Sequence, residues 1–237
     1  MMKGPMVLRT ACIPALTAVP GLVHGFEQRS QENGAETRGE TRERVRAALG
    51  PAGRLHLLKQ VHGVAVVAAP FEHSPEADAA TAAEPGILLG IETADCLPVL
   101  LVDPELRLVA AAHAGWRGTA GGVVSAAVDA LRARGSRPES LVAGLGPGIG
   151  PCCYEVGEEL RDAFGPLADA VFRRGPRGRP HLDVRAANVR QLRDAGLREE
   201  RVHHVGDCTA CTPELYPSYR RDGPGAGRMI SFVGFAR

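Results

Sequence analysis

The chain has 237 residues and a formal net charge of +1 at pH 7, and hydrophobic residues make up 44% of its composition. This apolar content is ordinary for a soluble globular protein, and the chain is long enough to bury one large core. The net charge gives no electrostatic case for binding nucleic acid or an acidic membrane surface, and no run approaches the roughly 18 apolar residues of a membrane-spanning helix.

The first half of the chain is predicted to be rich in strands. An extended lead-in over residues 1–21 precedes a polar loop at 27–43, which runs into a short helix over 42–49. Apolar runs bounded by turn residues then predict strands over 55–61, 64–69, 87–92, 98–103 and 107–112. Because only His62 and Gly63 separate the first two of these strands, we expect a tight reversal or a bulge between them.

Helices alternate with strands in the second half. Apolar residues fall on one face of a helix predicted over 118–134, and Asp183 is predicted to cap another. The remaining predicted helices cover 156–164 and 184–195, and the strands cover 141–145, 201–205 and 229–234. Since no repeat or long linker divides the chain, residues 1–237 are expected to form one mixed α/β domain with mostly antiparallel strands.

Three residues that can bind a metal stand next to apolar runs. They are His62 in KQVHG, Cys96 in TADCLPVLL and His113 in AAAHAGWRG. Two imidazoles and one thiolate are the ligands of an open zinc site, in which water or a substrate takes the fourth position. The intervals of 34 residues (62 to 96) and 17 residues (96 to 113) are too long for a zinc-finger knuckle. Separate strands must therefore converge to form the site.

The neighbours of these residues suit a pocket wall. Gly63 and Gly115 allow backbone or ligand to approach closely, and Asp95 can orient a ligand or accept a proton. The alternative interpretation is structural: Asp95 caps a strand end, and the trio is a buried cysteine with two hydrogen-bonded histidines.

The six cysteines bear on the compartment of the protein. The N-terminal segment is broken by Pro14 and Pro20 and makes a poor signal peptide. Because disulfides form mainly in exported proteins, the cysteines are expected to be thiols or metal ligands rather than a disulfide framework. We therefore expect a cytoplasmic protein.

Three further groups carry weaker signals. The glycine-rich segment 144–157 can bind an anion through its N–H groups, but a tight crossover explains it equally well, and it lacks the lysine of a P-loop. Arg220, Arg221 and Arg228 offer forked donors to a phosphate, although a solvated charged turn is favoured on composition.

The third group is thiol-rich. Cys208 and Cys211, with Cys152 and Cys153, offer four thiolates to a structural zinc ion, but adjacent cysteines rarely both point into one tetrahedral site. A Cys-x-x-Cys redox pair is the other interpretation, although no thioredoxin-like βαβ context surrounds it.

Six motifs occur in one order along the chain: HGF at 24–26, KQVHG at 59–63, TADCLPVLL at 93–101, AAHAGWRG at 111–118, GPGIGPCCYEVG at 146–157 and SYRRDG at 218–223. From about residue 22 to its C-terminus the chain resembles the laccase-domain family, first labelled multicopper polyphenol oxidases. Its members are now regarded as purine nucleoside phosphorylases with adenosine deaminase activity, and some are called peptidoglycan editing factors. The resemblance implies an α+β fold, a layered α/β sandwich with mixed sheets similar to the catalytic domain of cytotoxic necrotising factors.

The resemblance also implies an activity and its residues. It implies that His62, Cys96 and His113 bind a catalytic zinc ion, and that purine nucleoside and phosphate are the partners, with adenosine, inosine, guanosine or methylthioadenosine as substrate. Asp95 is expected to carry protons, and Arg29, Arg117 and Arg220 to balance the charge of phosphate. Zinc is expected rather than copper because several copper ions need more histidines than this trio offers. A monomer or weak homodimer that binds neither nucleic acid nor membrane is expected.

Two segments depart from the family pattern. The segment after HGF lacks the paired glycines of the family, which leaves Arg29 as the counterpart of its arginine, and Pro217 replaces an aromatic residue. Three alternative functions stay open: a copper-dependent polyphenol oxidase, a metal-free hydrolase with Cys96 as nucleophile and His113 as base, and a non-catalytic cell-wall maintenance factor.

Overall fold

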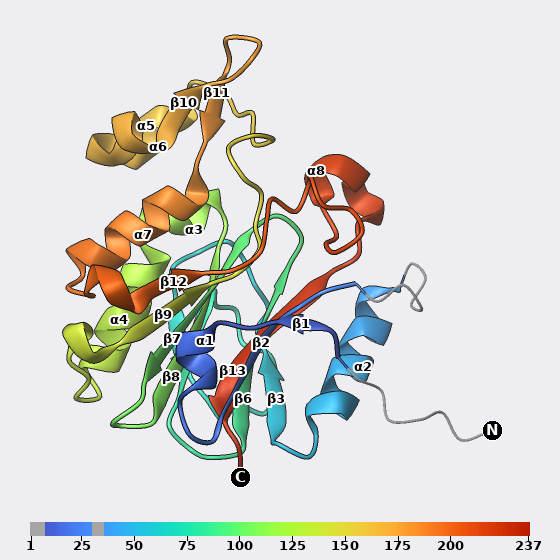
Figure 1. Cartoon of the computed structure of the whole chain (residues 1–237), viewed down its shortest axis with the longest axis vertical. Helices are drawn as coiled ribbons and strands as arrows, with labels where there is room; N and C mark the ends of the chain where they lie inside the picture. The colour runs from blue at the N-terminus through green and yellow to red at the C-terminus, as the bar shows by residue number, and fades with distance from the viewer. Residues whose placement is uncertain (1–7, 30–35) are drawn as a thin grey trace.

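The computed structural model describes residues 8–29 and 36–237, which form two large sheets and one hairpin (Figure 1). The five-stranded sheet contains, in spatial order, β1 (Thr10–Ala11), β2 (Leu22–Glu27), β13 (Met229–Phe235), β6 (Ile87–Thr93) and β3 (Arg54–Leu57). The six-stranded sheet contains β12 (Val202–His204), β9 (Val142–Leu145), β7 (Leu97–Asp103), β8 (Leu108–Ala114), β5 (Ala79–Ala82) and β4 (Val66–Ala68). The hairpin is β10 (Phe172–Arg174) and β11 (Pro180–Leu182).

Neighbouring strands are mostly antiparallel, as expected. The parallel pairs in the described part of the chain are β3 with β6, β4 with β5, and β9 with β12. Both large sheets are therefore mixed.

Helices cover the outer faces of the two large sheets. The longer helices are α2 (Arg38–Leu49), α4 (Val123–Arg132) and α7 (Val184–Asp194), and the shorter ones are α1 (Pro14–Thr17), α3 (Trp116–Gly121), α5 (Leu160–Phe164), α6 (Ala168–Val171) and α8 (Tyr219–Asp222). Helix α2 lies against the five-stranded sheet, whereas α4 packs on the six-stranded sheet and against α7 (Figure 1).

Three apolar clusters separate the resulting layers. Leu100 lies in the cluster between the two sheets, Val128 in the cluster beneath α4, and Val45 in the cluster beneath α2. The order helix, sheet, sheet, helix confirms the expected α+β class and layered sandwich with mixed sheets.

The helix predicted over 184–195 is found as α7, and the apolar face predicted within 118–134 is found on α4, whereas other predicted helices begin or end elsewhere. The apolar face of α4 is fully buried, and the Asp183 carboxylate accepts a hydrogen bond from Ala186 N at 2.9 Å at the start of α7. The single helix predicted over 118–134 is wrong, because Gly122 adopts a φ of 85° and divides it into α3 and α4. The helix predicted over 156–164 forms only as the short α5.

The expected reversal at His62 is also wrong, for a reason that matters for the site. Strands β3 and β4 belong to different sheets, so the connection between them crosses the sandwich. The connection from β6 to β7 crosses it in the same way, because those strands also lie in different sheets. His62 and Cys96 thus sit on two crossovers.

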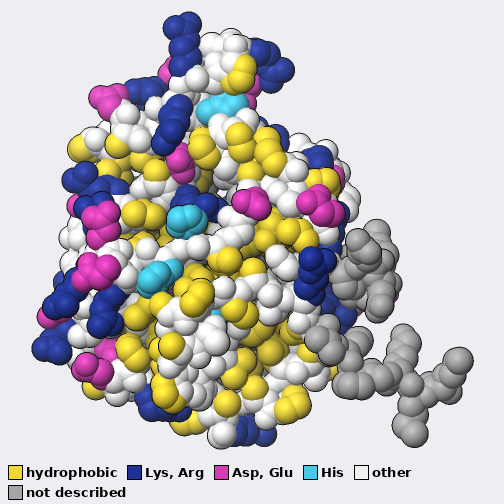
Figure 2. Space-filling view, in the orientation of Figure 1, with side chains coloured by type: hydrophobic (Ala, Val, Ile, Leu, Met, Phe, Trp, Pro, Cys, Tyr) yellow, Lys and Arg dark blue, Asp and Glu magenta, His cyan; other side chains and the backbone are white. Residues whose placement is uncertain are grey.

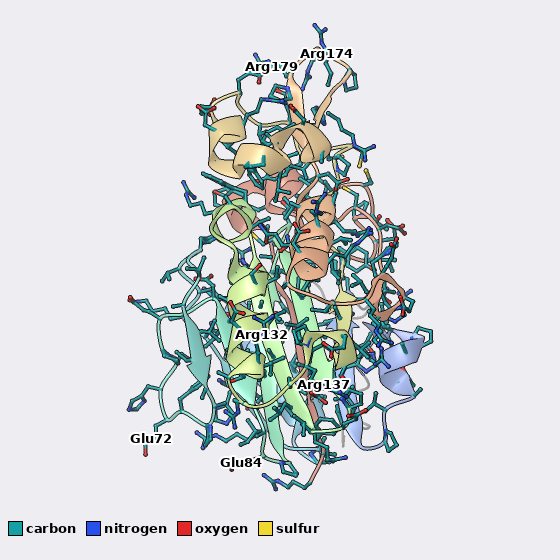
Figure 3. All side chains as sticks on the ribbon, turned by 90° about the vertical axis from the view of Figure 1, so that its left-hand side faces the viewer. Glu72, Glu84, Arg132, Arg137, Arg174 and Arg179 are labelled. Atoms are coloured by element: carbon teal, nitrogen blue, oxygen red, sulfur yellow. The ribbon has the colours of Figure 1, made fainter. Side chains whose placement is uncertain are left out.

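Charged side chains of both signs are spread over the surface. Figure 2 shows basic and acidic groups interspersed on one face, and Figure 3 shows Arg174 and Arg179 at the tip of the β10–β11 hairpin, with Glu72 and Glu84 at the opposite end of the molecule. The face in Figure 2 therefore offers no continuous basic surface of the kind that binds nucleic acid phosphates. In the part of the chain that the structure describes, no helix has the length and apolar character needed to cross a bilayer.

Candidate metal centre and substrate cavity

His62, Cys96 and His113 come together at one end of the sandwich. His62 and Cys96 lie on the two crossovers, and His113 lies on β8 directly opposite Pro98 of β7. One ligand atom from each of the three side chains lies within 4.8 Å of the other two, and the imidazole ring centroids are 4.8 Å apart. The expected convergence of separate strands is therefore found.

A buried carboxylate holds both histidines in place. Asp78, which is fully buried just before β5, accepts a hydrogen bond through Oδ1 from His113 Nδ1 at 2.8 Å and from His62 N at 2.9 Å. Its Oδ2 accepts hydrogen bonds from Gly63 N at 2.6 Å and from Val61 N at 3.2 Å. A carboxylate behind a histidine fixes the ring orientation and leaves the other nitrogen for a metal.

Asp78 is a functional residue that was not predicted from the sequence, although the sequence carries a signal for it. The residue stands among alanines in the segment Ala77–Ala80, and a charged residue in such an apolar run needs a partner when buried. The sequence alone could not identify that partner, because the fold determines which residues lie beside Asp78.

The three side chains also set the charge of the site. Burial by itself would raise the pKa of the Cys96 thiol, but hydrogen bonds with His113 and His62 outweigh it and lower that pKa to about 6. Burial likewise opposes a charged His113, yet its hydrogen bonds with Asp78 and Cys96 raise the pKa of the imidazole to about 9. In the absence of a metal, a thiolate therefore lies beside a protonated imidazole, whose positive charge a bound cation would replace.

The backbone around the trio leaves room for a metal ion. A Cβ at Gly115 would lie 3.0 Å from Cys96 Sγ and 3.2 Å from His62 Cδ2, so a larger residue would push the ligands apart. His62 has a φ of 63°, a conformation that its amide hydrogen bond to Asp78 helps to hold. The donor set of two nitrogens and one sulfur, with an open side, fits zinc.

Replacement of Gly115 by alanine is expected to weaken zinc binding by about 10- to 100-fold, the range observed when groups that position metal ligands are changed. Competition with a chelator of known affinity measures the change. Gly63→Ala is the matched control, because its Cβ would meet Asp78 Oδ2 at an ordinary 3.5 Å. Equal zinc affinities of the two variants would contradict the steric role of Gly115.

A cavity of about 450 Å³ opens beside the trio, a size typical of small-molecule sites. Among its lining residues are Asp95, Arg117, Arg220 and Arg228, all of which the sequence singled out. Arg38 of α2 lines it as well and was missed, because it reaches the cavity only through the packing of α2 on the five-stranded sheet.

Through hydrogen bonds, Asp95 connects the crossover that carries Cys96 to two later segments of the chain. Its Oδ1 accepts a hydrogen bond from Thr209 Oγ1 and its Oδ2 from Arg220 N, both at 2.6 Å, and its carbonyl accepts one from Ile149 N at 2.8 Å. The residue adopts a φ of 91°, which is strained for a non-glycine residue and is retained by these contacts. Asp95 thus positions the crossover as well as lining the cavity.

The arginines differ in their anchoring. The Arg220 guanidinium donates to the carbonyl of Glu155 at 2.8 Å, and the Arg117 guanidinium lies 4.5 Å from the centroid of Trp116. Arg29 is absent from the cavity lining; its guanidinium donates to the Pro213 carbonyl at 3.1 Å and lies 3.6 Å from Asp222.

A buried ion pair joins α2 to the cavity wall. Glu92, whose side chain is 1% exposed, accepts hydrogen bonds from the guanidinium groups of Arg38 and Arg42. Gln60 donates to the Glu92 carbonyl at 2.8 Å and accepts from Glu92 N at 2.9 Å, which links the first crossover to β6. Burial would raise the pKa of Glu92, but the two arginines lower it below its usual value.

The variant Glu92→Gln is expected to have a free energy of unfolding about 2 kcal/mol lower than that of the wild type at pH 7. This loss is smaller than for a fully buried ion pair, because both arginines are partly exposed. The stabilisation by Glu92 is complete above its unfolded-state pKa and is lost as the pH falls through its lower folded-state pKa. Urea unfolding at pH 7 and at pH 3 measures this difference. A stability gap that is the same at both pH values would contradict the role of the ion pair.

The chain matches the family model described as multi-copper polyphenol oxidoreductase laccase over residues 28–236. A purine nucleoside phosphorylase from Deinococcus radiodurans is 44% identical over 201 residues, which cover 84% of this chain and 77% of that protein. Adenosine deaminase RL5, from an unknown prokaryotic organism, is 38% identical over 152 residues. That alignment covers 62% of this chain and 58% of RL5, so the chain matches less than two thirds of RL5.

The fold has a solved counterpart. The crystal structure of YlmD from Geobacillus stearothermophilus superposes with a TM-score of 0.84 at 28% identity and covers 98% of this chain and 100% of that chain. The likeness therefore extends over nearly the whole chain.

Proposed function

The chain belongs to the multi-copper polyphenol oxidoreductase laccase family, and on this premise we propose that it is a zinc-dependent purine nucleoside phosphorylase that also deaminates adenosine. Its substrates are adenosine, inosine, guanosine or methylthioadenosine, with phosphate as the co-substrate. The observation that carries the proposal is the trio His62, Cys96 and His113, which faces a cavity of about 450 Å³ with four arginines in its lining.

His62, Cys96 and His113 are the proposed ligands of the zinc ion. When bound, zinc supplies a Lewis acid that stabilises negative charge and activates an attacking oxygen nucleophile near neutral pH. A multicopper assembly has little support, because His62 and His113 are the histidines among the described residues that line the cavity.

The cavity arginines are the proposed phosphate site. Arg117, Arg220 and Arg228 bring positive charge and forked N–H donors, the groups that hold phosphate oxygens best. Arg38 also lines the cavity, but its Nε and Nη2 donate to Glu92, so it contributes less charge to a bound phosphate. Arg220 is fixed by the carbonyl of Glu155 and so presents its remaining donors in a defined direction. Arg29 is engaged by Pro213 and Asp222 and has no part in this proposal.

The same cavity has surfaces for a purine ring. Tyr154, Trp116 and Tyr219 contribute aromatic side chains to the lining, and Ile149 and Val184 contribute apolar ones. A flat, apolar base with polar edges suits such a wall, on which it can stack.

In phosphorolysis, a phosphate oxygen attacks C1′ of the nucleoside, the glycosidic bond breaks, and the purine and ribose 1-phosphate leave. The arginines would hold the phosphate against C1′, which turns an encounter of two molecules into a reaction between positioned groups. Asp95 is the proposed proton carrier for the departing base. Because the same carboxylate accepts a hydrogen bond from Arg220 N, it also keeps this arginine in position.

The test is incubation of metal-analysed protein with adenosine, with and without phosphate, followed by separation of all products in one chromatogram. The proposal expects adenine and ribose 1-phosphate only when phosphate is present, and inosine under both conditions. Inosine alone would contradict phosphorolysis. The absence of any turnover would favour a non-catalytic role, and oxygen uptake with stoichiometric copper would favour the polyphenol oxidase.

A further inference from the structure

Four cysteines gather outside the substrate cavity. Cys152 and Cys153 lie in the loop after β9, and Cys208 and Cys211 lie in the loop after β12. Their four Sγ atoms all lie within 4.8 Å of one another, and none of the four residues lines the cavity. Sulfur atoms from two distant segments therefore form one compact group.

The separations between sulfur atoms are close to those around a single metal ion. Cys211 Sγ lies 3.3 Å from Cys153 Sγ and 3.6 Å from Cys152 Sγ. Four sulfurs at the zinc–thiolate distance of about 2.3 Å stand about 3.8 Å apart at the corners of a tetrahedron. A disulfide needs a sulfur separation of about 2.05 Å, which no pair in the group approaches.

The local backbone explains how adjacent cysteines can share one site. Cys153 N and Tyr154 N both donate to the carbonyl of Gly150, at 3.0 Å each, so the chain turns tightly at this point. The turn places Cys152 and Cys153 on the same side of the loop, within reach of the other two sulfurs. Adjacent cysteines rarely both point into one tetrahedral site, but this turn allows Cys152 and Cys153 to do so.

The second pair of cysteines has the character of a metal-binding turn. Cys211 N donates to the carbonyl of Cys208 at 3.1 Å, which closes a Cys-x-x-Cys turn of the spacing found in structural zinc sites. Cys208 Sγ also accepts a hydrogen bond from Gly150 N at 3.2 Å. An amide donor stabilises the negative charge of a thiolate, the form in which cysteine binds metals.

We propose that Cys152, Cys153, Cys208 and Cys211 bind one structural zinc ion, separate from the ion at His62, Cys96 and His113. Binding forms four zinc–sulfur bonds, releases the thiol protons to solvent and involves no change of oxidation state. The ion fastens the loop after β9 to the loop after β12.

Holding these two loops together stabilises the wall of the substrate cavity. Thr209 lies next to Cys208 and donates to Asp95, and Arg220 donates through its side chain to the carbonyl of Cys153 at 3.4 Å. The zinc ion therefore stabilises the two loops that hold Asp95 and Arg220, without contacting the substrate.

Zinc content per chain tests the proposal. The wild type purified from zinc-supplemented medium is expected to contain two zinc ions, and His113→Ala one. Cys208→Ser with Cys211→Ser, added to His113→Ala, is expected to contain none. Cys12→Ser is the matched control, because this exposed cysteine lies outside both groups and should leave two ions.

A second measurement leaves the four cysteines intact, so that it does not depend on the folding of the cysteine variants. In His113→Ala, titration with a mercurial is expected to release the remaining zinc ion as the four clustered thiols react, in addition to the thiols of Cys12 and Cys96. Cobalt in its place should give the strong near-ultraviolet absorption of thiolate ligands. A folded His113→Ala protein without zinc, or with a disulfide among the four cysteines after purification under reducing conditions, would overturn the proposal.

Discussion

The variant Cys96→Ala is expected to lose the zinc ion at the trio and to lower both phosphorolysis and adenosine deamination by at least about 10³-fold, because a catalytic metal contributes several kcal/mol to transition-state stabilisation. Cys96 supplies the sulfur of the donor set and is within hydrogen-bonding reach of both imidazoles. Without it, two nitrogens remain, one fewer than the three protein ligands of a catalytic zinc site. Metal analysis and steady-state assays of the same preparation measure both losses.

Cys12→Ser is the control for this variant as well. Its thiol donates to the backbone carbonyl of His24 and lies outside the trio, so zinc content and both activities should stay at the wild-type level. A Cys96→Ala protein that keeps its full zinc content and phosphorolysis would contradict the ligand assignment.

Chelation of the wild type separates the metal mechanism from a cysteine hydrolase. The pKa of about 6 makes Cys96 a thiolate at neutral pH, so metal-free protein should be alkylated quickly at this residue. The zinc mechanism expects this protein to be inactive on nucleosides and to recover activity when zinc is restored. Activity that survives complete removal of the metal would instead support Cys96 as the nucleophile.

Long apolar elements were predictable from the sequence, and short ones were not. Strands β6, β7 and β8 were predicted within two residues of their ends, because each is a continuous apolar run buried between layers. Helix α1 is a single turn within a segment expected to be extended, and β5 consists of alanine and threonine, so neither gives a periodic signal. The earlier start of α2 was readable, because Thr37 and Glu40 form a capping box.

The candidate site was also predictable from the sequence only in part. The trio could be proposed from residue type alone, since histidine and cysteine are common ligands wherever the chain brings them together. The contacts that organise it could not, because Asp78 meets His113 only through the pairing of β5 with β8. Arg38 likewise depends on the docking of α2, and the paired cysteines depend on a turn that no composition rule describes.

Asp78 is the residue outside the trio whose loss should have the largest effect. Its replacement by alanine removes the acceptor of three successive amides, from Val61 to Gly63, and of the His113 ring nitrogen. The free energy of unfolding is expected to fall by about 3 kcal/mol, because these buried donors lose their partner. Zinc affinity should fall by about 10- to 100-fold, because His113 is no longer oriented.

Asp78→Asn separates these two roles, and Glu76→Gln provides the control. The asparagine keeps one acceptor oxygen but not the carboxylate charge, so it should recover part of the stability and less of the zinc affinity. Glu76 lies two residues away in an exposed ion pair with Lys59, and because solvent screens such a pair, its loss should leave the free energy of unfolding nearly unchanged. Urea unfolding and chelator competition measure the three variants. If Asp78→Ala bound zinc as tightly as Glu76→Gln, the Asp78 carboxylate would not position the metal ligands, and the way the crossover at His62 is held would need another explanation.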